Sequence, residues 1–356
     1  MIVFRKETFF TIIDRVLWIQ IFLMTSSPDH GAFVISLDLE LFWGVRDHIE
    51  SNEHYFENLH GEREAVHAIL KIFAEYEIAA TWAAVGIIFA ESDDDCRRLT
   101  PSIIPQYANT NLSPYSDLSP KGIDRSLLYA PDIIDSIKRT PRQEIATHTF
   151  SHFYCMESGQ TPEAFRADIG SAIRAANERS VEVRSIVFPR NQHNPDYDQI
   201  LIDNGISCYR GNQRSRLYQF GRRPTDRPYY RAARLADTFL KLSGHNITEW
   251  NSVWKGEIAD VPASMFLRPV TSDKGLLNRI QLRRLVKCME DAANTKGIFH
   301  LWWHPHNFGL NLEPNIEFLR KILESFRVMH DRGSIRSMSM AEVADRAPRT
   351  FGKSRS

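Results

Sequence analysis

Residues 32–40 read AFVISLDLE, and this stretch decides the fold. The short apolar run 32–37 has the composition of a buried strand, and two carboxylates, Asp38 and Glu40, follow it directly. The segment 62–76 then shows the apolar spacing of an amphipathic helix, and a second strand-like run follows at 78–85. A buried strand, a helix and another strand in this order indicate a parallel βαβ unit.

The alternation of strands and helices continues along the chain. Further strands are expected at 144–147, 183–188, 206–209, 298–303 and 334–337, and further helices at 162–177, 195–204, 278–295 and 314–330. Two segments interrupt the pattern: residues 91–130 predict a long loop without regular structure, and residues 211–262 contain many Arg and Tyr and show no clear period. No Gly- or Ser-rich linker divides the sequence, so we expect one α/β domain with irregular insertions.

The composition is that of an ordinary globular protein and excludes several classes. The 356 residues include 44 Lys and Arg and 44 Asp and Glu, so the formal net charge is zero and gives no sign of a nucleic-acid partner. The four cysteines are widely spaced and form no C-x-x-C pair, which indicates reduced thiols rather than disulfides or a zinc knuckle. The sequence contains no G-x-G-x-x-G motif and no P-loop to support a nucleotide enzyme.

The two ends of the chain are expected to lie outside the domain. Residues 1–30 form an N-terminal extension with an apolar run, 16–24, that is too short for a transmembrane helix. Three interpretations stay open: Met24 is the true start, the segment is an ordered or membrane-surface helix, or residues 1–27 are an export signal. Without export the protein is expected in the cytoplasm. The polar, basic tail 346–356 is expected to be flexible.

Polar clusters follow four of the expected strands, where the reactive groups of parallel α/β folds gather. Asp38 and Glu40 follow the first strand, and strand periodicity places them on one side if the backbone stays extended. His148 and His152 follow the strand at 144–147, and their i, i+4 spacing on a helical turn would allow both imidazoles to bind one metal ion. For the two carboxylates taken alone, the alternative is a helix N-cap or a surface salt bridge. For the two histidines taken alone, the alternative is that they are unrelated surface residues.

The other two clusters contain a guanidinium and two imidazoles. Arg190 follows the fourth strand, where an arginine could orient a carboxylate bidentately. His304 and His306 follow a late strand, and a histidine there is suited to donate a proton near neutral pH. The candidate substrate contacts are Trp43, Asn191, Trp303 and His306. The alternative for the tryptophans is the hydrophobic core.

Read in order, these clusters resemble the NodB-homology polysaccharide deacetylases, carbohydrate esterase family 4, over residues 32–345. The resemblance implies a distorted (β/α)7 barrel with irregular insertions over residues 31–345. It also implies one divalent metal ion, expected to be zinc, and the hydrolysis of acetyl groups from N-acetylated sugars. The family's His-x-x-x-His motif is similar to His148 and His152, which the resemblance makes metal ligands.

The resemblance also implies roles for the remaining residues. Asp38 matches the general base, and because Leu39 stands where common members have a second Asp, Glu40 takes the ligand role in a divergent Asp-x-Glu pattern. Arg190 matches the arginine that orients the base, and His304 matches the general acid, with His306 able to replace it. The family's Trp-containing motif has no clean match, and its replacement is sought at Arg231, Arg234 and Asp237.

The expected function is therefore that of a metal-dependent hydrolase of a carbon–nitrogen bond, which removes an N-acetyl group from a sugar of a surface polysaccharide or its precursor. The Arg- and Tyr-rich stretch 214–234 could contact phosphate groups of a nucleotide- or lipid-linked precursor. Two alternatives stay open: an amide hydrolase of the same fold that acts on a cyclic amide or allantoin-like substrate, with no need of a metal, and a non-catalytic carbohydrate-binding barrel. A base together with an acid favours catalysis.

Overall fold

The structure is a computed structural model that describes residues 27–47, 54–219, 228–270 and 275–349, and its centre is the strand β1, Gly31–Leu39. This strand pairs in parallel with β2, Ala80–Ala84, on one side. On its other side it pairs in parallel with β9, Ile298–Trp303. The strand β10, Ile335–Met338, pairs in parallel with residues 31–34 on the same side as β2. The strands expected from the apolar runs are therefore present, and their parallel pairing is the one that βαβ units give.

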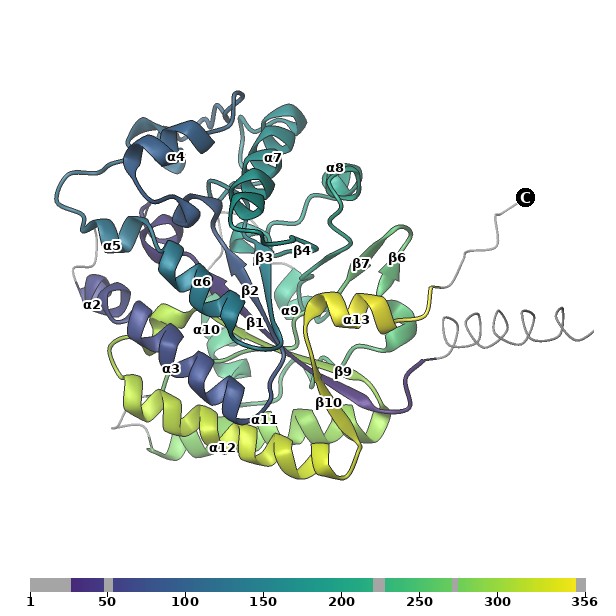
Figure 1. The fold of residues 1–356 in the computed structure, drawn as a ribbon. Helices are drawn as coiled ribbons and strands as arrows, with labels where there is room; N and C mark the ends of the chain where they lie inside the picture. The colour runs from purple at the N-terminus through teal and green to yellow at the C-terminus, as the bar shows by residue number, and fades with distance from the viewer. Residues whose placement is uncertain (1–26, 48–53, 220–227, 271–274, 350–356) are drawn as a thin grey trace, which may run out of the picture.

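The sheet extends away from β1 in both directions (Figure 1). Beyond β2 it continues through β3, Gln143–Thr147, β4, Ser185–Ile186, β5, Cys208–Tyr209, β7, Ile258–Asp260, and β6, Trp254–Lys255. Beyond β9 it ends at β8, Met265–Phe266. Only the β6–β7 pair is antiparallel among the described strands.

Residues 261–264 connect the two ends of the sheet. They lie between β7 and β8, which are at opposite ends of the strand order. Val261 N donates to Tyr209 O at 2.9 Å on the side of β5, and Ser264 N donates to His300 O at 2.8 Å on the side of β9. The sheet therefore curls into a distorted barrel, as expected, although the described residues form ten strands rather than seven.

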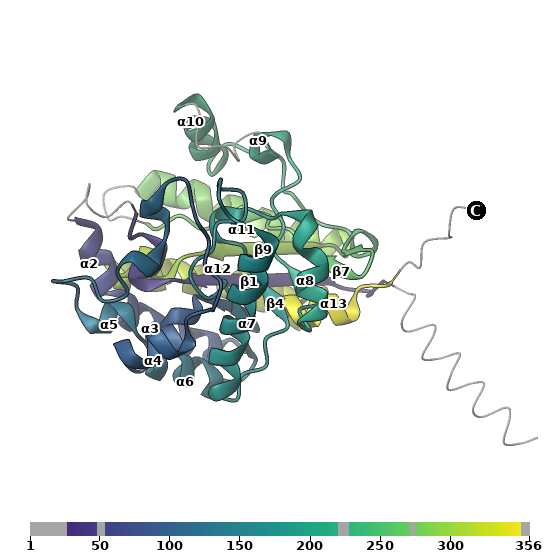
Figure 2. The ribbon, with the colours of Figure 1, turned by 90° about the horizontal axis from the view of Figure 1, so that it is seen from above.

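Helices cover the outside of the sheet (Figures 1 and 2). The helices are α2, His54–His60, α3, Glu62–Glu75, α4, Asp93–Leu99, α5, Arg125–Leu128, α6, Pro131–Arg139, α7, Pro162–Glu178, α8, Asp198–Asp203, α9, Arg216–Gln219, α10, Pro228–Asp237, α11, Gly275–Thr295, α12, Leu312–Asp331, and α13, Met340–Arg346. Figure 2 shows that α9 and α10 stand out from the rest of the molecule. The helix α7 begins as expected, because Thr161 Oγ1 accepts the amide hydrogen of Ala164.

Strand periodicity divides β1 between two environments. Phe33, Ile35 and Leu37 pack with the surrounding helices in the large hydrophobic core. Ala32 and Val34 belong to a smaller cluster formed with the other strands, inside the barrel. Asp38 continues the inner face, because successive side chains of a strand alternate between its two faces. The barrel interior therefore leads from an apolar floor to a carboxylate at the carboxyl end.

The two segments predicted to be irregular contain regular secondary structure. Residues 91–130 are not a structureless loop, since they include α4 and α5 and two single turns of 3₁₀ helix. The stretch 211–262 contains α9, α10, β6 and β7. The four cysteines are buried with free thiols, as expected. Most of the N-terminal extension and of the basic tail, for which the sequence suggests several interpretations, lies outside the described residues.

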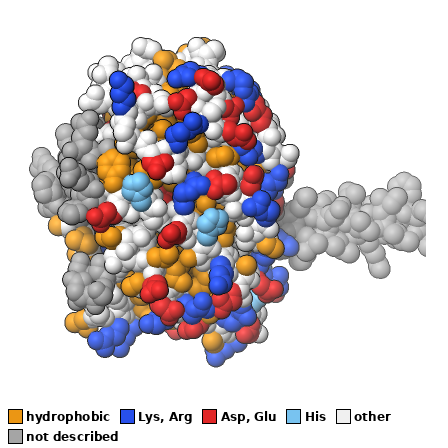
Figure 3. Space-filling view, turned by 60° about the vertical axis from the view of Figure 1, so that its left-hand side comes forward, with side chains coloured by type: hydrophobic (Ala, Val, Ile, Leu, Met, Phe, Trp, Pro, Cys, Tyr) orange, Lys and Arg blue, Asp and Glu red, His pale blue; other side chains and the backbone are white. Residues whose placement is uncertain are grey.

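Two surface properties agree with the composition. Among the described residues no helix has the length and hydropathy that a bilayer crossing requires. Figure 3 shows one face of the molecule, on which acidic and basic side chains are interspersed rather than gathered into a patch of one sign.

Candidate active site

The carboxyl end of β1 presents two buried carboxylates. Asp38 is within the strand, and Glu40 follows it at the start of a single 3₁₀ turn, Leu41–Gly44. A Cβ atom at position 44 would overlap the carboxylate of Glu40, so the Glu40 side chain can take this position only because residue 44 is glycine. The two acidic groups therefore lie at one end of the barrel, as the sequence predicts.

Arg210, which follows β5, binds the carboxylate of Asp38. Its Nη1 and Nη2 donate to the two carboxylate oxygens of Asp38 at 2.6 and 2.7 Å. Arg210 Nη1 also donates to Ser36 Oγ. His300 Nε2 lies 2.8 Å from that oxygen, and its Nδ1 lies 3.1 Å from the carbonyl oxygen of Val261, so Nδ1 is the donor and Nε2 accepts from Ser36. The bidentate contact from Arg210 fixes the orientation of the Asp38 carboxylate.

Glu40 lies among three histidines. Its Oε1 is 2.9 Å from His148 Nε2 and 3.3 Å from His152 Nε2, and both histidines are buried. His304 Nε2 is 3.6 Å from Glu40 Oε1 and 3.8 Å from Asp38 Oδ2, and its side chain is 24% exposed. The expected convergence of Asp38, Glu40, His148, His152 and His304 is therefore present in the structure.

The segment that presents His148 and His152 is not the helical turn that the spacing suggests. Thr149 and His152 have φ of 63° and 57°, and the backbone between β3 and α7 is irregular. Asp168 of α7 holds this segment, because its carboxylate accepts the amide hydrogens of Phe150 and Ser151 at 2.6 and 3.2 Å. It also accepts from the Ser151 hydroxyl. A buried carboxylate thus replaces the helical hydrogen bonds that this turn lacks.

These residues fit a divalent cation. The ligating atoms of Glu40, His148 and His152 lie within 4.8 Å of one another, and so do those of Asp38, Glu40 and His304. Both ring nitrogens of His148 are buried and have no hydrogen bond to a described residue, although Nε2 is close to Glu40. His152 Nδ1 lies 3.1 Å from the Tyr154 hydroxyl, the outer contact that orients a metal-binding imidazole. One carboxylate and two imidazoles match the donor set of a catalytic zinc site.

The electrostatics of the site favour charged carboxylates and a protonated His304. Burial alone would raise the pKa of Asp38, but Arg210 and then His148 outweigh it and lower that pKa. Burial likewise opposes the ionisation of Glu40, whose pKa the three histidines hold well below its ordinary value. Burial lowers the pKa of His304, but Glu40 and Asp38 overcome this effect and raise it.

The structure does not place Arg190 against Asp38. Arg190 pairs with Asp47, lies 3.7 Å from Glu157, and stacks over the ring of Tyr154 at 4.3 Å. Arg210 takes the place expected for it. Arg210 is also one residue beyond an expected strand, so the positional rule could have found it, but the sequence does not show which of two arginines faces the barrel interior.

The two tryptophans proposed as substrate contacts are core residues. Trp43 is fully buried and donates to the carbonyl oxygen of Leu128 at 2.8 Å. Trp303 is fully buried and stacks on Phe308 at 5.7 Å between ring centroids. Trp302 instead faces the site, with its ring 5.7 Å from that of His304. Strand periodicity could have indicated this, because residues 300, 302 and 304 share one face of β9 if it continues.

His306 and Asn191 lie beside the site. His306 is buried, stacks on His304 at 5.0 Å, and its Nε2 is 2.7 Å from the Tyr55 hydroxyl. Burial lowers the pKa of His306 to about 3, so it is a neutral neighbour rather than a replacement acid. Asn191 Oδ1 accepts from Arg210 Nη2 at 3.0 Å.

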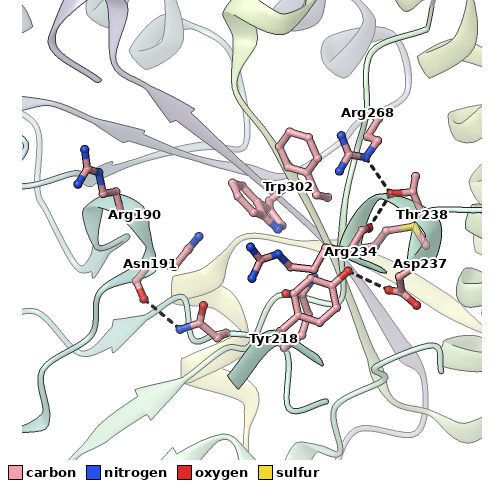
Figure 4. Close-up of a pocket in the computed structure, with 12 residues that line it drawn as sticks. Arg190, Asn191, Tyr218, Arg234, Asp237, Thr238, Arg268 and Trp302 are labelled. Carbon is pink, nitrogen blue, oxygen red and sulfur yellow. Dashed lines mark hydrogen bonds between the residues drawn. The ribbon is translucent and has the colours of Figure 1, made fainter. Parts of the chain in front are cut away.

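A cavity of about 300 Å³ opens next to Trp302 (Figure 4). Arg234 and Asp237, two of the three residues that are candidates to replace the Trp-containing motif, line it, and the side chain of the third, Arg231, lies outside the described residues. Sequence reasoning missed Arg268, which also lines it. No pattern marks Arg268, because it comes from an irregular segment after β8.

Comparisons with known proteins bear on the fold and the family. Residues 55–209 match the family model described as polysaccharide deacetylase, which confirms the resemblance. This part contains His148, His152 and Arg190 but not Asp38, Glu40 or His304. A search of curated proteins finds no match.

Solved structures resemble this chain at low identity. A putative polysaccharide deacetylase from Mycobacterium smegmatis has a TM-score of 0.58 at 15% identity, over 92% of this chain and 96% of its own. Puue allantoinase has a TM-score of 0.48 at 12% identity, over 91% and 96%. A family 4 carbohydrate esterase pseudoenzyme from Bacillus anthracis has a TM-score of 0.41 at 11% identity, over 90% and 67%. The first of these likenesses supports the barrel fold.

Proposed function

We propose that this chain, whose residues 55–209 match the family model described as polysaccharide deacetylase, is a metal-dependent hydrolase that removes the N-acetyl group of a sugar. The sugar is a unit of a surface polysaccharide or of its precursor. Residues 31–345 form the catalytic domain in this proposal, and the metal ion is zinc.

One observation carries the proposal: Asp38, Glu40, His148, His152 and His304 converge from three separate strand ends on one point of the rim. The Nε2 atom of His304 is within 3.8 Å of both carboxylates. A site for binding alone needs no base, acid and ligand set in one place, so the arrangement favours hydrolysis.

Glu40, His148 and His152 are the residues that would hold the ion, which supplies a Lewis acid for the amide carbonyl and lowers the pKa of bound water. Asp38, kept ionised by Arg210, accepts the proton of the attacking water. His304 is positioned to donate a proton to the departing amine, and its partial exposure gives a substrate access to it. Trp302 and Asn191 lie at the edge of this site, where they would contact the sugar.

The test measures acetate release from N-acetylated sugars in monomeric, nucleotide-linked and polymeric form, with protein first treated with a chelator and then supplied with zinc. Asp38→Asn and His304→Ala should each lower kcat by about 10²- to 10⁴-fold. His304→Ala should leave the thermal midpoint nearly unchanged, whereas Asp38→Asn leaves the buried Arg210 guanidinium without its counter-charge and is assayed below its own midpoint. Asp94→Asn is the matched control, because Asp94 is 95% exposed on α4. Normal turnover in either site variant, or no acetate from any of these sugars, contradicts the proposal. Full activity of the chelator-treated protein would instead favour a metal-independent amide hydrolase.

A further inference from the structure

The cavity beside Trp302 adjoins the candidate active site. Phe266 and Trp302 are two of its walls, and both rings contact His304, at centroid distances of 6.1 and 5.7 Å. The guanidinium of Arg210 lies 4.1 Å from the Trp302 ring on the side of Asp38. A sugar whose acetamide is next to His304 can therefore place another substituent in this cavity.

Basic groups dominate the lining of the cavity. Arg190, Arg234 and Arg268 line it, and Asp237 is the one carboxylate among its described lining residues (Figure 4).

Asp237 already has its partners. Its carboxylate accepts from the Tyr218 hydroxyl at 2.8 Å and from the amide and hydroxyl of Ser243 at 2.7 Å each. Arg284 Nη2 is 3.4 Å away. Asp237 is therefore engaged by groups of its own surroundings and forms no ion pair with Arg268.

Arg268 is different from the other basic groups. Its Nε donates to Thr238 Oγ1 at 2.9 Å, which fixes the guanidinium at the cavity wall. No carboxylate of the described residues forms an ion pair with it, and burial lowers its pKa. A partly buried guanidinium without a counter-charge is costly, and a bound anion would remove that cost.

We infer that this cavity is a subsite for an anionic substituent, a carboxylate or a phosphate, carried by the N-acetylated sugar, and that Arg268 is the residue that selects it. The inference rests on the proposed function. Asn212 adds a side-chain amide with two N–H groups to the lining, and one of them is donated to the carbonyl oxygen of Asn191 at 3.0 Å.

The experiment compares four N-acetylated probes: N-acetylglucosamine, its 1-phosphate, its 6-phosphate and the corresponding uronic acid. We expect kcat/KM of at least one anionic probe to exceed that of the neutral sugar by roughly 10- to 100-fold. In Arg268→Met the ratio of anionic to neutral kcat/KM should fall by roughly tenfold or more. Arg268→Lys, which keeps the charge but not the fork, should lose less of this ratio. Arg139→Met, an exposed arginine on α6, is the matched control and should keep it.

Binding separates this inference from the proposed function. Calorimetry on Asp38→Asn protein measures the affinity of the same four probes without turnover. Tighter binding of an anionic probe that Arg268→Met abolishes supports the subsite even if no acetate is released, in which case the proposed function fails alone. Equal affinity for neutral and anionic probes, or an equal loss for all four in Arg268→Met, overturns the subsite. A preference for the uronic acid identifies a carboxylate, and a preference for a phosphate ester identifies a phosphate.

Discussion

At the scale of single residues, Arg210 determines the orientation and the charge of the Asp38 carboxylate. Its side chain is fully buried, it makes the bidentate contact to the carboxylate, and it also contacts Ser36 and Asn191. A buried ion pair of this kind contributes little net stability compared with a hydrophobic pair, but losing one partner leaves an uncompensated charge. The guanidinium is therefore a positioning group for the base.

Arg210→Met should lower the free energy of unfolding by about 3–5 kcal/mol, because the carboxylate of Asp38 stays buried without its partner. Urea denaturation at neutral pH measures this loss. The control is Arg184→Met, which breaks an exposed pair with Asp345 and should cost about 1 kcal/mol or less. Equal losses in the two variants would show that the buried pair has no special role.

The neighbouring tryptophans Trp302 and Trp303 should respond differently to truncation. Trp303→Ala removes a fully buried ring from the core and should cost about 3–5 kcal/mol of unfolding free energy. Trp302→Ala removes a partly exposed ring from the cavity, so we expect a smaller stability loss and a larger rise in KM. Unfolding curves and steady-state kinetics of both variants check this, and the reversed order of effects would contradict the assignment.

At the scale of elements, the segment between β3 and α7 depends on one side chain of the helix. Asp168 accepts two backbone amides of this segment, between His148 and His152. Burial raises the pKa of Asp168 to about 6, although its hydrogen bonds oppose the increase. Because the folded state binds this proton more tightly than the unfolded chain, its contribution to stability is complete below the ordinary pKa and is lost as pH rises through about 6.

The corresponding prediction concerns Asp168→Asn. Between pH 4 and pH 7 the wild-type protein should lose about 2.4 kcal/mol of stability from this group, and the variant should lack that component. Urea denaturation of both proteins at several pH values in this range gives the difference, in which the titration of all other groups cancels. Parallel pH profiles for the two proteins would contradict the assignment of a raised pKa.

The sequence was sufficient to locate the main strands but not to predict which side chains point into the barrel. The apolar runs located β1, β2, β3 and β9, because a buried parallel strand has to be apolar on both faces. They did not show which side chains at the strand ends point into the barrel, since the curvature and register of the strands depend on the whole sheet. The sequence therefore points to Arg190 and Trp303, whereas the structure has Arg210 against Asp38 and Trp302 beside His304.

The candidate site likewise contains residues that the sequence predicts and residues that it does not. The acidic pair, the histidine pair and His304 could be found because each directly follows a strand, where parallel folds place their chemistry. The cavity could not be found in this way, because Arg268 and Asp237 come from irregular or inserted segments whose positions no local pattern determines. Local propensity likewise does not determine the irregular backbone at Thr149, which tertiary hydrogen bonds hold in place.

At the scale of the whole molecule, the ligand set predicts that zinc stabilises the fold. By mass action, zinc at one hundred times its dissociation constant should add about 2.7 kcal/mol to the free energy of unfolding. Thermal unfolding with chelator and with added zinc measures this shift. It should vanish in His152→Ala and persist in His67→Ala, which changes an exposed histidine of α3. No shift in the wild-type protein would contradict the metal site.

The position of β1 has a consequence for how the protein is made. This strand precedes the other described strands in the chain, but its neighbours β9 and β10 follow most of them. Until residues 298–303 have been synthesised, the edge of β1 that pairs with β9 has no partner. The barrel can therefore close only after the residues of β9 have been synthesised, and such distant pairings make folding slow and dependent on protection from aggregation.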